Sequence, residues 1–371
     1  MTRKQLHIVS FDVPYPPSYG GVIDVFYKVK ALQELGVNVH LHCFKYGRSE
    51  SEALNEICAS VHYYERRQEH NLLFSRDPYI IASRRSEELL MRISADAVPV
   101  LFEGLHCCAY LSSPQLKNKK KLVRTHNIEH DYYRSLADVE NHLFKRLYFR
   151  REACKLERFE KNLSLADKIL AISPADAASL AKRYSNVQHV MAFHPYEDVS
   201  CLPGKGDFAF YHGNLEVGEN NQAALFLVNE VFSGLDFPLV IAGNNPSEEL
   251  QKAVKTKKNI SLKANISTEE IDRLIAEAQV NVLPTFQATG IKLKLLAALF
   301  RGRFCLVNTP MVANTGVESF CILAETAPAM KARLREIFRK DFDEQEILRR
   351  REILLEKFSN RKNAEKIIAL L

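Results

Sequence analysis

Residues 6–44 read LHIVSFDVPYPPSYGGVIDVFYKVKALQELGVNVHLHCF, and this stretch decides the fold class. A short apolar run, 6–13, predicts a strand. The prolines and glycines of 14–21 then exclude a helix or a central strand. Apolar residues next recur at intervals of three and four over 22–32, which predicts one buried face of a helix. A second apolar run, 37–44, predicts the next strand, so the stretch is a strand–helix–strand unit.

The same alternation continues on both sides of a linker at 195–207, which carries proline and glycine and few apolar residues. Further strands are expected at 60–64, 98–102, 121–125, 168–172, 188–191, 208–212, 238–242, 259–263, 280–283 and 303–307. Helices are expected at 141–164, 221–232, 247–255, 268–278 and 292–300, the fourth after an S-x-x-E capping box. Repeated units of this kind predict an α/β protein with two Rossmann-like, doubly wound domains facing a cleft. Ligands of such folds bind at the carboxyl ends of the strands.

The composition of the chain argues against several classes of function. The 371 residues carry 51 basic and 45 acidic side chains, a formal net charge of +6, which does not indicate a nucleic-acid partner. No apolar run approaches a membrane span, and the first residues lack the apolar core of a secretory signal. The eight cysteines are scattered and form no C-x-x-C pair. This pattern predicts reduced thiols in a cytoplasmic protein.

The first candidate for an anion site is Gly20-Gly21, between the first strand and the first helix. Glycines let the backbone approach a phosphate, and a helix N-terminus favours an anion. A turn that is merely tight explains the pair equally well. The stretch is neither G-x-G-x-x-G nor a P-loop, so simple dinucleotide and NTPase interpretations lose support.

Two further candidates lie in the second half. Thr289-Gly290-Ile291-Lys292-Leu293-Lys294 follows a strand and opens a helix. The lysines are either solvated or hold an anionic ligand. Cations are disfavoured at a helix N-terminus, which favours the ligand. Gly213-Asn214 follows strand 208–212, where a Rossmann-like domain presents backbone to phosphate, although an ordinary tight turn accounts for it as well.

Histidines and a carboxylate follow two strands of the first half. His126 ends strand 121–125 and opens H-x-x-E-H with Glu129 and His130, an inverted zinc-protease pattern. A strand-end His126 would not share a helix with His130, so a histidine facing the cleft fits better than zinc. Glu103 and His106 end strand 98–102 and could act as acid, base or hydrogen-bond donor, or lie in a solvated loop.

The expected helix 141–164 is basic as well as amphipathic. Seven basic side chains between 145 and 161 are mixed with apolar ones and interrupted by three glutamates. Such a helix either lies on an anionic membrane or presents a solvated face. Peripheral contact with an inner membrane surface therefore stays open.

Four motifs, in this order and spacing, make the chain similar to GT-B-type glycosyltransferases of the large retaining family 4 group. They are Pro14-x-Pro16-x3-Gly20-Gly21, Arg124-Thr125-His126-Asn127-Ile128-Glu129, Gly213-Asn214 and Gly290-Ile291-Lys292-Leu293-Lys294-Leu295-Leu296-x5-Gly302. The resemblance covers nearly the whole chain. It implies an acceptor domain at 1–195, a nucleotide-sugar domain at 208–350 and a final helix, 351–371, that crosses back to the first domain.

The resemblance also implies roles for particular residues. Those matching the donor diphosphate site are Gly20, Gly21, Gly213, Asn214, Thr289, Gly290, Ile291, Lys292 and Lys294. Glu103, His106 and His126 match positions that face the donor sugar or the acceptor, and are the expected catalytic residues. No metal and no cofactor are implied.

The sequence departs from the family pattern in two ways. Many members carry an Arg and a Lys after the glycine that matches Gly213, and residues 214–221 of this chain contain neither. The family carries two glutamates eight residues apart, where this chain has Thr289 and Ala297. The first glutamate usually contacts the sugar and the second the ribose. Lys292 is a candidate replacement for a missing cation, and Glu318 for a missing carboxylate that would hold the donor sugar or ribose.

The sequence therefore predicts a hexosyltransferase-type glycosyltransferase. It would move a sugar from a UDP- or GDP-linked donor to a glycan or lipid-linked acceptor, with retention. Three alternatives stay open: a catalytically silent GT-B-shaped binding subunit, a zinc hydrolase built on His126, Glu129 and His130, and a nucleotide-sugar epimerase.

Overall fold

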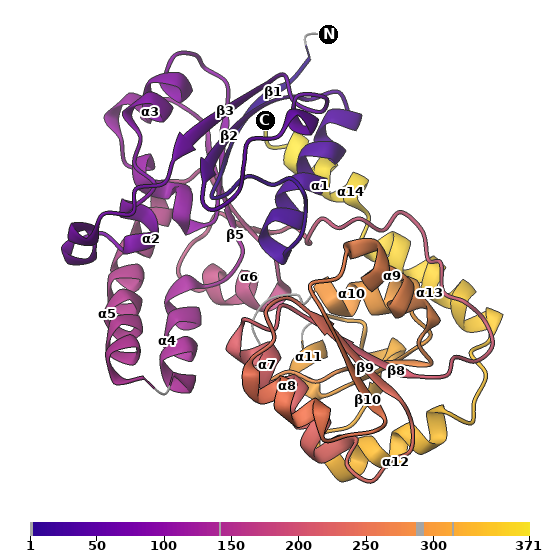
Figure 1. Ribbon diagram of the computed structural model, residues 1–371. Coiled ribbons are helices and arrows are strands. Elements are labelled where there is room, and N and C mark those ends of the chain that lie inside the picture. Colours follow the sequence, from indigo (N-terminus) through magenta and orange to yellow (C-terminus); the bar gives the residue numbers. More distant parts are fainter. Residues whose placement is uncertain (1–2, 141, 287–292, 314) are drawn as a thin grey trace. The chain divides into compact units, whose positions relative to one another are not determined.

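The structure is a computed structural model that describes residues 3–140, 142–286, 293–313 and 315–371 (Figure 1). The chain forms two compact units. Unit 1 consists of Met1–Pro195 together with Asn360–Leu371, and unit 2 consists of Tyr196–Ser359.

Unit 1 is built on a seven-stranded sheet in the order β3-β2-β1-β4-β5-β6-β7, and all the strand pairs described in it are parallel. The strands are β1 (Gln5–Ser10), β2 (Asn38–Lys45), β3 (Ser60–Glu65), β4 (Val100–Glu103), β5 (Lys121–Thr125), β6 (Lys168–Ala171) and β7 (Val187–His189). The order reverses at β1, which pairs with both β2 and β4. This reversal is the topological switch point, where open parallel sheets bind ligands at their carboxyl edge.

Helices cover both faces of this sheet. The α-helices of unit 1 are α1 (Gly20–Glu34), α2 (Tyr79–Ala82), α3 (Glu87–Ser94), α4 (Glu129–Val139), α5 (Leu143–Glu160), α6 (Pro174–Ala181) and α14 (Asn360–Ile368). Short 3₁₀ turns lie at Glu52–Leu54, His70–Phe74, Leu105–Tyr110, Pro114–Leu116 and Lys161–Leu165. Ile8 and Val9 belong to two different apolar clusters because successive side chains of a strand point to opposite faces.

The last helix of the chain is part of unit 1. In Figure 1, α14 lies beside α1, and Ala364 and Ile367 are buried in the same cluster as Val25 and Val29. Lys4 Nζ donates a hydrogen bond to the Ile368 carbonyl at 2.7 Å. The segment 351–371, expected as one helix, holds the end of α13 (Glu344–Lys357), a break at Phe358 and Ser359, and α14.

Unit 2 is built on a six-stranded parallel sheet in the order β10-β9-β8-β11-β12-β13. Its strands are β8 (Ala209–His212), β9 (Leu239–Gly243), β10 (Ile260–Ala264), β11 (Val280–Leu283), β12 (Phe304–Val307) and β13 (Ile322–Leu323). Its other helices are α7 (Gly218–Phe226), a π-helical turn (Leu227–Val231), α8 (Glu248–Lys255), α9 (Thr268–Glu277), α10 (Leu293–Arg301), α11 (Thr309–Val312), a 3₁₀ turn (Glu318–Phe320) and α12 (Ala327–Ile337).

The two doubly wound α/β units confirm the predicted fold class. The N-cap at Ser267 is confirmed, because Ser267 Oγ accepts a hydrogen bond from the Glu270 amide at the start of α9. The Glu270 carboxylate pairs with Lys263 and Arg273, so the contacts described give only the serine half of the predicted capping box. The helix expected at 141–164 is shorter: α5 ends at Glu160 and continues only as a 3₁₀ turn.

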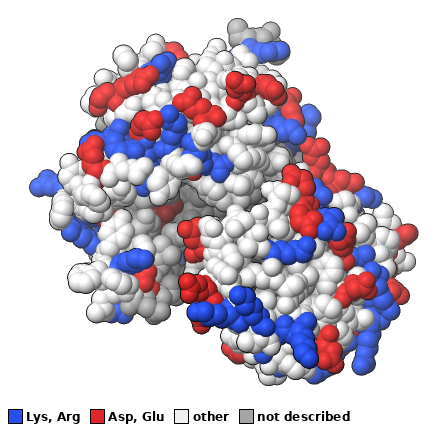
Figure 2. Space-filling model, in the orientation of Figure 1, with Lys and Arg blue, Asp and Glu red and all other residues white. Residues whose placement is uncertain are grey.

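On the face drawn in Figure 2, basic and acidic side chains are interspersed, in keeping with their near balance of 51 and 45. Among the described residues, no helix combines the length and the apolar character needed to cross a bilayer.

Candidate active site

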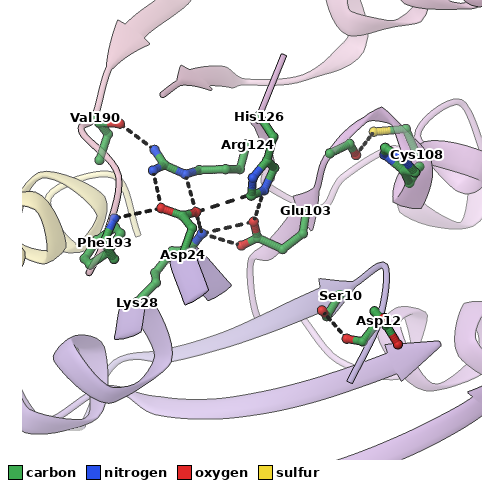
Figure 3. Close-up of polar contacts among 12 residues, drawn as sticks. Ser10, Asp12, Asp24, Lys28, Glu103, Cys108, Arg124, His126, Val190 and Phe193 are labelled. Atoms are coloured by element: carbon green, nitrogen blue, oxygen red, sulfur yellow. Dashed lines mark hydrogen bonds and ion pairs between the residues drawn. The ribbon is translucent and has the colours of Figure 1, made fainter. Parts of the chain in front are cut away.

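Glu103 and His126 meet at the carboxyl edge of the first sheet. Glu103 is the last residue of β4, and His126 follows the last residue of the neighbouring β5. His126 Nε2 lies 3.1 Å from Glu103 Oε2, and Figure 3 shows the two side chains pointing toward each other. This contact brings together two of the three predicted catalytic residues.

A buried aspartate, Asp24 of α1, lies against the same pair. Arg124 holds it with two hydrogen bonds, Nε to Oδ2 at 3.0 Å and Nη2 to Oδ1 at 2.8 Å. The Phe193 amide donates a third to Oδ1 at 2.8 Å. Burial alone would raise the pKa of Asp24, but Arg124 and Lys28 hold that pKa well below its usual range. Asp24 is therefore ionised although it is fully buried.

Lys28, one helical turn after Asp24, neutralises the second carboxylate. Its Nζ lies 2.8 Å from Asp24 Oδ2 and 2.8 Å from Glu103 Oε1, and all three side chains are fully buried. Burial tends to raise the pKa of Glu103, but Lys28 and the hydrogen bond from His126 lower it overall. An ionised carboxylate only accepts hydrogen bonds. His126 Nε2 therefore carries a proton in this contact.

His106 lies near this pair, separated from His126 by an aromatic ring. The Phe11 ring is 5.5 Å from the rings of both His106 and His126, centroid to centroid. His106 Nδ1 is 3.9 Å from Glu129 Oε1. Burial and the cation of Arg84 lower the pKa of His106. Burial and the nearby Glu160 raise the pKa of Glu129 to about 8. At pH 7 both partners are therefore neutral.

The zinc-hydrolase pattern is not assembled. The helix α4 begins at Glu129, so His126 precedes it, as expected from the strand end. His130 Nδ1 lies 2.8 Å from Glu160 Oε1, whereas His126 contacts Glu103. Within the described ranges, the one triad of potential metal ligands is Asp24, Glu103 and His126, and it contains neither His130 nor Glu129.

The Gly20-Gly21 pair forms the first residues of α1. This helix has no side-chain cap and no acidic residue in its first turn, so its first amides are not occupied by such a group. A Cβ on Gly21 would lie 2.7 Å from Phe11 Cζ, so a larger residue there would displace the Phe11 ring. Arg48 Nη1 donates to Ser18 Oγ at 2.9 Å, which adds a cation beside the helix start. The anion site at the glycine pair stays a prediction, beside the tight packing of Gly21 on Phe11.

In unit 2, Asn220 links Lys294 to Asn214 at the carboxyl end of β8. Lys294 Nζ donates to Asn220 Oδ1 at 2.7 Å, and Asn220 Nδ2 donates to the Asn214 carbonyl at 3.0 Å. A Cβ on Gly213 would lie 3.1 Å from Asn220 Cγ, so glycine makes room for this bridge. Burial and the charge of Lys294 lower the pKa of the neighbouring His212 to about 3.

Of the other donor residues predicted in this unit, the structure describes only Glu318. Thr289, Gly290, Ile291 and Lys292 lie outside the described residues. Glu318 is exposed, and its Oε1 accepts from the Gly316 amide at 3.3 Å. No contact described for the chain joins Glu318 to Lys294.

Ala297 occupies a core position. It is 4% exposed and packs in the cluster of Phe210 and Leu274. A glutamate at this place in α10 would therefore meet apolar neighbours.

Sequence reasoning missed Asp24, Lys28 and Arg124. Asp24 and Lys28 are four residues apart on the buried side of α1, beside its apolar positions, and Arg124 interrupts a buried strand. Charged residues at such positions need buried partners, and that was the available signal.

No protein-family model matches this chain. It is 29% identical over 332 residues to an uncharacterized 44.6 kDa protein in the cps region of Klebsiella pneumoniae, covering 84% of this chain and 83% of that protein.

Solved structures resemble it over almost its full length. A glycosyltransferase from Rickettsia africae has a TM-score of 0.66 at 13% identity and covers 100% of this chain and 98% of its own. A mutant of S. aureus TarM, in complex with fondaparinux, α-GlcNAc-glycerol and UDP, has a TM-score of 0.68 at 11% identity, with 99% of each chain covered. The chain therefore has the two-domain, Rossmann-like GT-B fold, as the sequence predicted.

Proposed function

We propose that this protein is a glycosyltransferase that moves a hexose from a UDP- or GDP-linked donor to a glycan or lipid-linked acceptor, with retention. The observation that carries the proposal is the position of Lys294. It lies in the first turn of α10, where a cation is disfavoured, and Asn220 holds it beside Gly213-Asn214. A diphosphate bound there would accept a charge-assisted hydrogen bond from the Lys294 ammonium. The similarity to solved glycosyltransferases, one of them holding UDP, supports the same conclusion.

On the donor side, the chemistry is charge stabilisation. Breaking the sugar–phosphate bond leaves negative charge on the departing diphosphate, and a preorganised lysine and backbone amides stabilise it without a metal. In unit 1, the amides of Gly20 and Gly21 at the start of α1 are further proposed contacts of a donor diphosphate. So are Thr289, Gly290, Ile291 and Lys292, with Glu318 as the proposed sugar or ribose contact.

For the acceptor, His126 is the residue that we propose to contact the reacting hydroxyl group. Glu103 holds its Nε2–H, so Nδ1 is the ring nitrogen left to form a hydrogen bond with a sugar or acceptor hydroxyl. His106, neutral beside Glu129, would contact the same ligands. In a retaining transfer the acceptor oxygen attacks the face that the diphosphate leaves, and the diphosphate oxygen takes the acceptor proton.

Thermal unfolding against UDP, GDP, ADP, CMP and their sugar conjugates tests this function. We expect one nucleotide class to raise the midpoint by about 5–10 °C at a concentration a hundredfold above its Kd, because a ligand of the native state stabilises it. Free phosphate is the control. No shift with any donor would contradict the proposal and favour the catalytically silent binding subunit. Conversion of a bound donor without acceptor into an isomeric nucleotide-sugar would indicate the epimerase.

We also propose peripheral contact with an anionic membrane through the start of α5. Leu143, Phe144 and Leu147 are 66%, 80% and 68% exposed. The same stretch of the helix carries the basic side chains Lys145, Arg146, Arg150 and Arg151. Apolar side chains ringed by such cations suit an anionic lipid surface.

Substituting serine for Leu143, Phe144 and Leu147 together is expected to weaken binding to phosphatidylglycerol-containing vesicles by at least tenfold, since each buried apolar side chain contributes about 1.5–3 kcal/mol. Vesicle co-sedimentation measures this. Met91→Ser, on α3 and 65% exposed, is the matched control and should bind as the wild type does. Wild-type protein that stays in the supernatant with anionic vesicles would contradict the proposal.

A further inference from the structure

Asp24, Glu103 and His126 form a group that resembles a metal site. One ligand atom from each lies within 4.8 Å of the others. Two carboxylates and an imidazole are a set that divalent zinc, cobalt or manganese accepts. Two carboxylates and an imidazole this close together are therefore expected to surround a cation.

The protein already supplies that cation. Lys28 Nζ lies 2.8 Å from Asp24 Oδ2 and 2.8 Å from Glu103 Oε1, and its side chain is fully buried (Figure 3). Its ammonium therefore bridges the two carboxylates from which a metal ion would take its oxygen ligands. His126 Nε2 approaches the same Glu103 from another direction, at 3.1 Å.

The charges of the group balance only with Lys28 present. Two carboxylates, Asp24 and Glu103, face two cations, Arg124 and Lys28. Arg124 is committed to Asp24 and to the Val190 and Met191 carbonyls. Lys28 is therefore the fixed cation that contacts Glu103, and its loss would leave one buried negative charge uncompensated.

We infer that Lys28 is a positioning residue: its ammonium is the built-in cation of the Asp24–Glu103–His126 group. It fixes Glu103, and through Glu103 the ring of His126. The place it fills becomes a divalent-cation site when the side chain is shortened. The role toward His126 rests on the proposed function, whereas the cation site can be tested without any donor or acceptor.

Lys28→Ala in the full chain, titrated with Zn²⁺ and Co²⁺, tests the inference. We expect the variant to unfold at a lower temperature than the wild type, and Zn²⁺ a hundredfold above its Kd to restore about 5–10 °C. Co²⁺ should give visible absorption bands. The wild type should show neither effect. Lys28→Ala/Glu103→Gln, which lacks one ligand, should lose the response to both metals.

Lys155→Ala is the matched control. Lys155 is also buried in unit 1, and its Nζ lies 2.7 Å from Glu152 Oε1. Glu152 is not one of the three potential metal ligands. This variant should be destabilised without a response to metal. Ring-nitrogen NMR adds a readout that a merely structural role would not change. The His126 proton should sit on Nε2 in the wild type and on Nδ1 in zinc-loaded Lys28→Ala.

Two results would overturn the inference. One is a folded Lys28→Ala that ignores both metals, and the other is a wild type that binds them equally well. If Lys28→Ala is recovered unfolded, refolding with and without Zn²⁺ decides the matter: recovery only with Zn²⁺ supports the inference, and no recovery contradicts it. Nucleotide binding, measured separately on the wild type, reports on the proposed transferase function alone.

Discussion

Lys294→Ala is expected to lower the affinity for the nucleotide-diphosphate donor by about 10- to 100-fold. A charge-assisted hydrogen bond to a buried anion contributes about 1.5–3 kcal/mol, and each 1.4 kcal/mol is a tenfold change. The fold should survive, because the Lys294 ammonium points to Asn220 at the carboxyl edge of the sheet and not into the apolar core. Calorimetric titration with the nucleotide selected by thermal unfolding measures the loss.

Lys252→Ala serves as the control for a lost positive charge in the same unit. Lys252 is 77% exposed on α8 and pairs with Glu248 of the same helix, so its loss should leave donor affinity unchanged. Full affinity in Lys294→Ala would show that the diphosphate is not bound at the end of β8, and the donor-site proposal would then be wrong.

Asp24→Asn is expected to reduce the free energy of unfolding by about 3–5 kcal/mol, the cost of breaking a buried ion pair from one side. The amide cannot accept all the hydrogen bonds that Arg124, Lys28 and the Phe193 amide donate. For a unit of this size, the unfolding midpoint should fall by about 6–20 °C. Circular dichroism is the appropriate probe because the chain has no tryptophan.

Asp198→Asn is the control variant that tests how much of this loss of stability depends on the burial of the ion pair. Asp198 is also held by one arginine through two contacts, Arg351 Nε at 2.8 Å and Nη2 at 3.2 Å, but its side chain is 58% exposed. Exposed pairs contribute at most about 1 kcal/mol, so this variant should unfold within a few degrees of the wild type. Equal effects of the two substitutions would mean that the Asp24 network contributes little to stability.

The strand–helix alternation was predictable because buried parallel strands and amphipathic helices leave different periods in the sequence. No helix was predicted over 66–97, although Leu89, Leu90 and Ile93 of α3 recur at helical spacing. The same stretch holds α2, only four residues long, whose first amide is bound by Glu152 of the distant α5 at 2.6 Å. The conformation of α2 therefore depends on a contact with a distant helix, which no pattern within the segment itself could predict.

The types of residue at the site could be predicted from the sequence, whereas the contacts between these residues could not. Glu103 and His126 end two strands, which already places them at one edge of a sheet. That they touch depends on β4 and β5 being neighbours, which only the strand order reveals. Lys28 and Asp24 reach them from α1, far away in the sequence, and their partners became known only with the fold.

The packing of α14 against α1 has a consequence for the order of synthesis. Ala364 and Ile367 complete the apolar cluster that contains Val25 and Val29, and the whole of unit 2 is translated between them. At ribosomal rates of about 5–20 residues per second, that interval is on the order of 10 s. During it, the nascent first unit carries an uncovered apolar patch on the helix that bears Asp24 and Lys28. A chaperone that shields α1 in that interval would keep the patch from aggregating until α14 emerges.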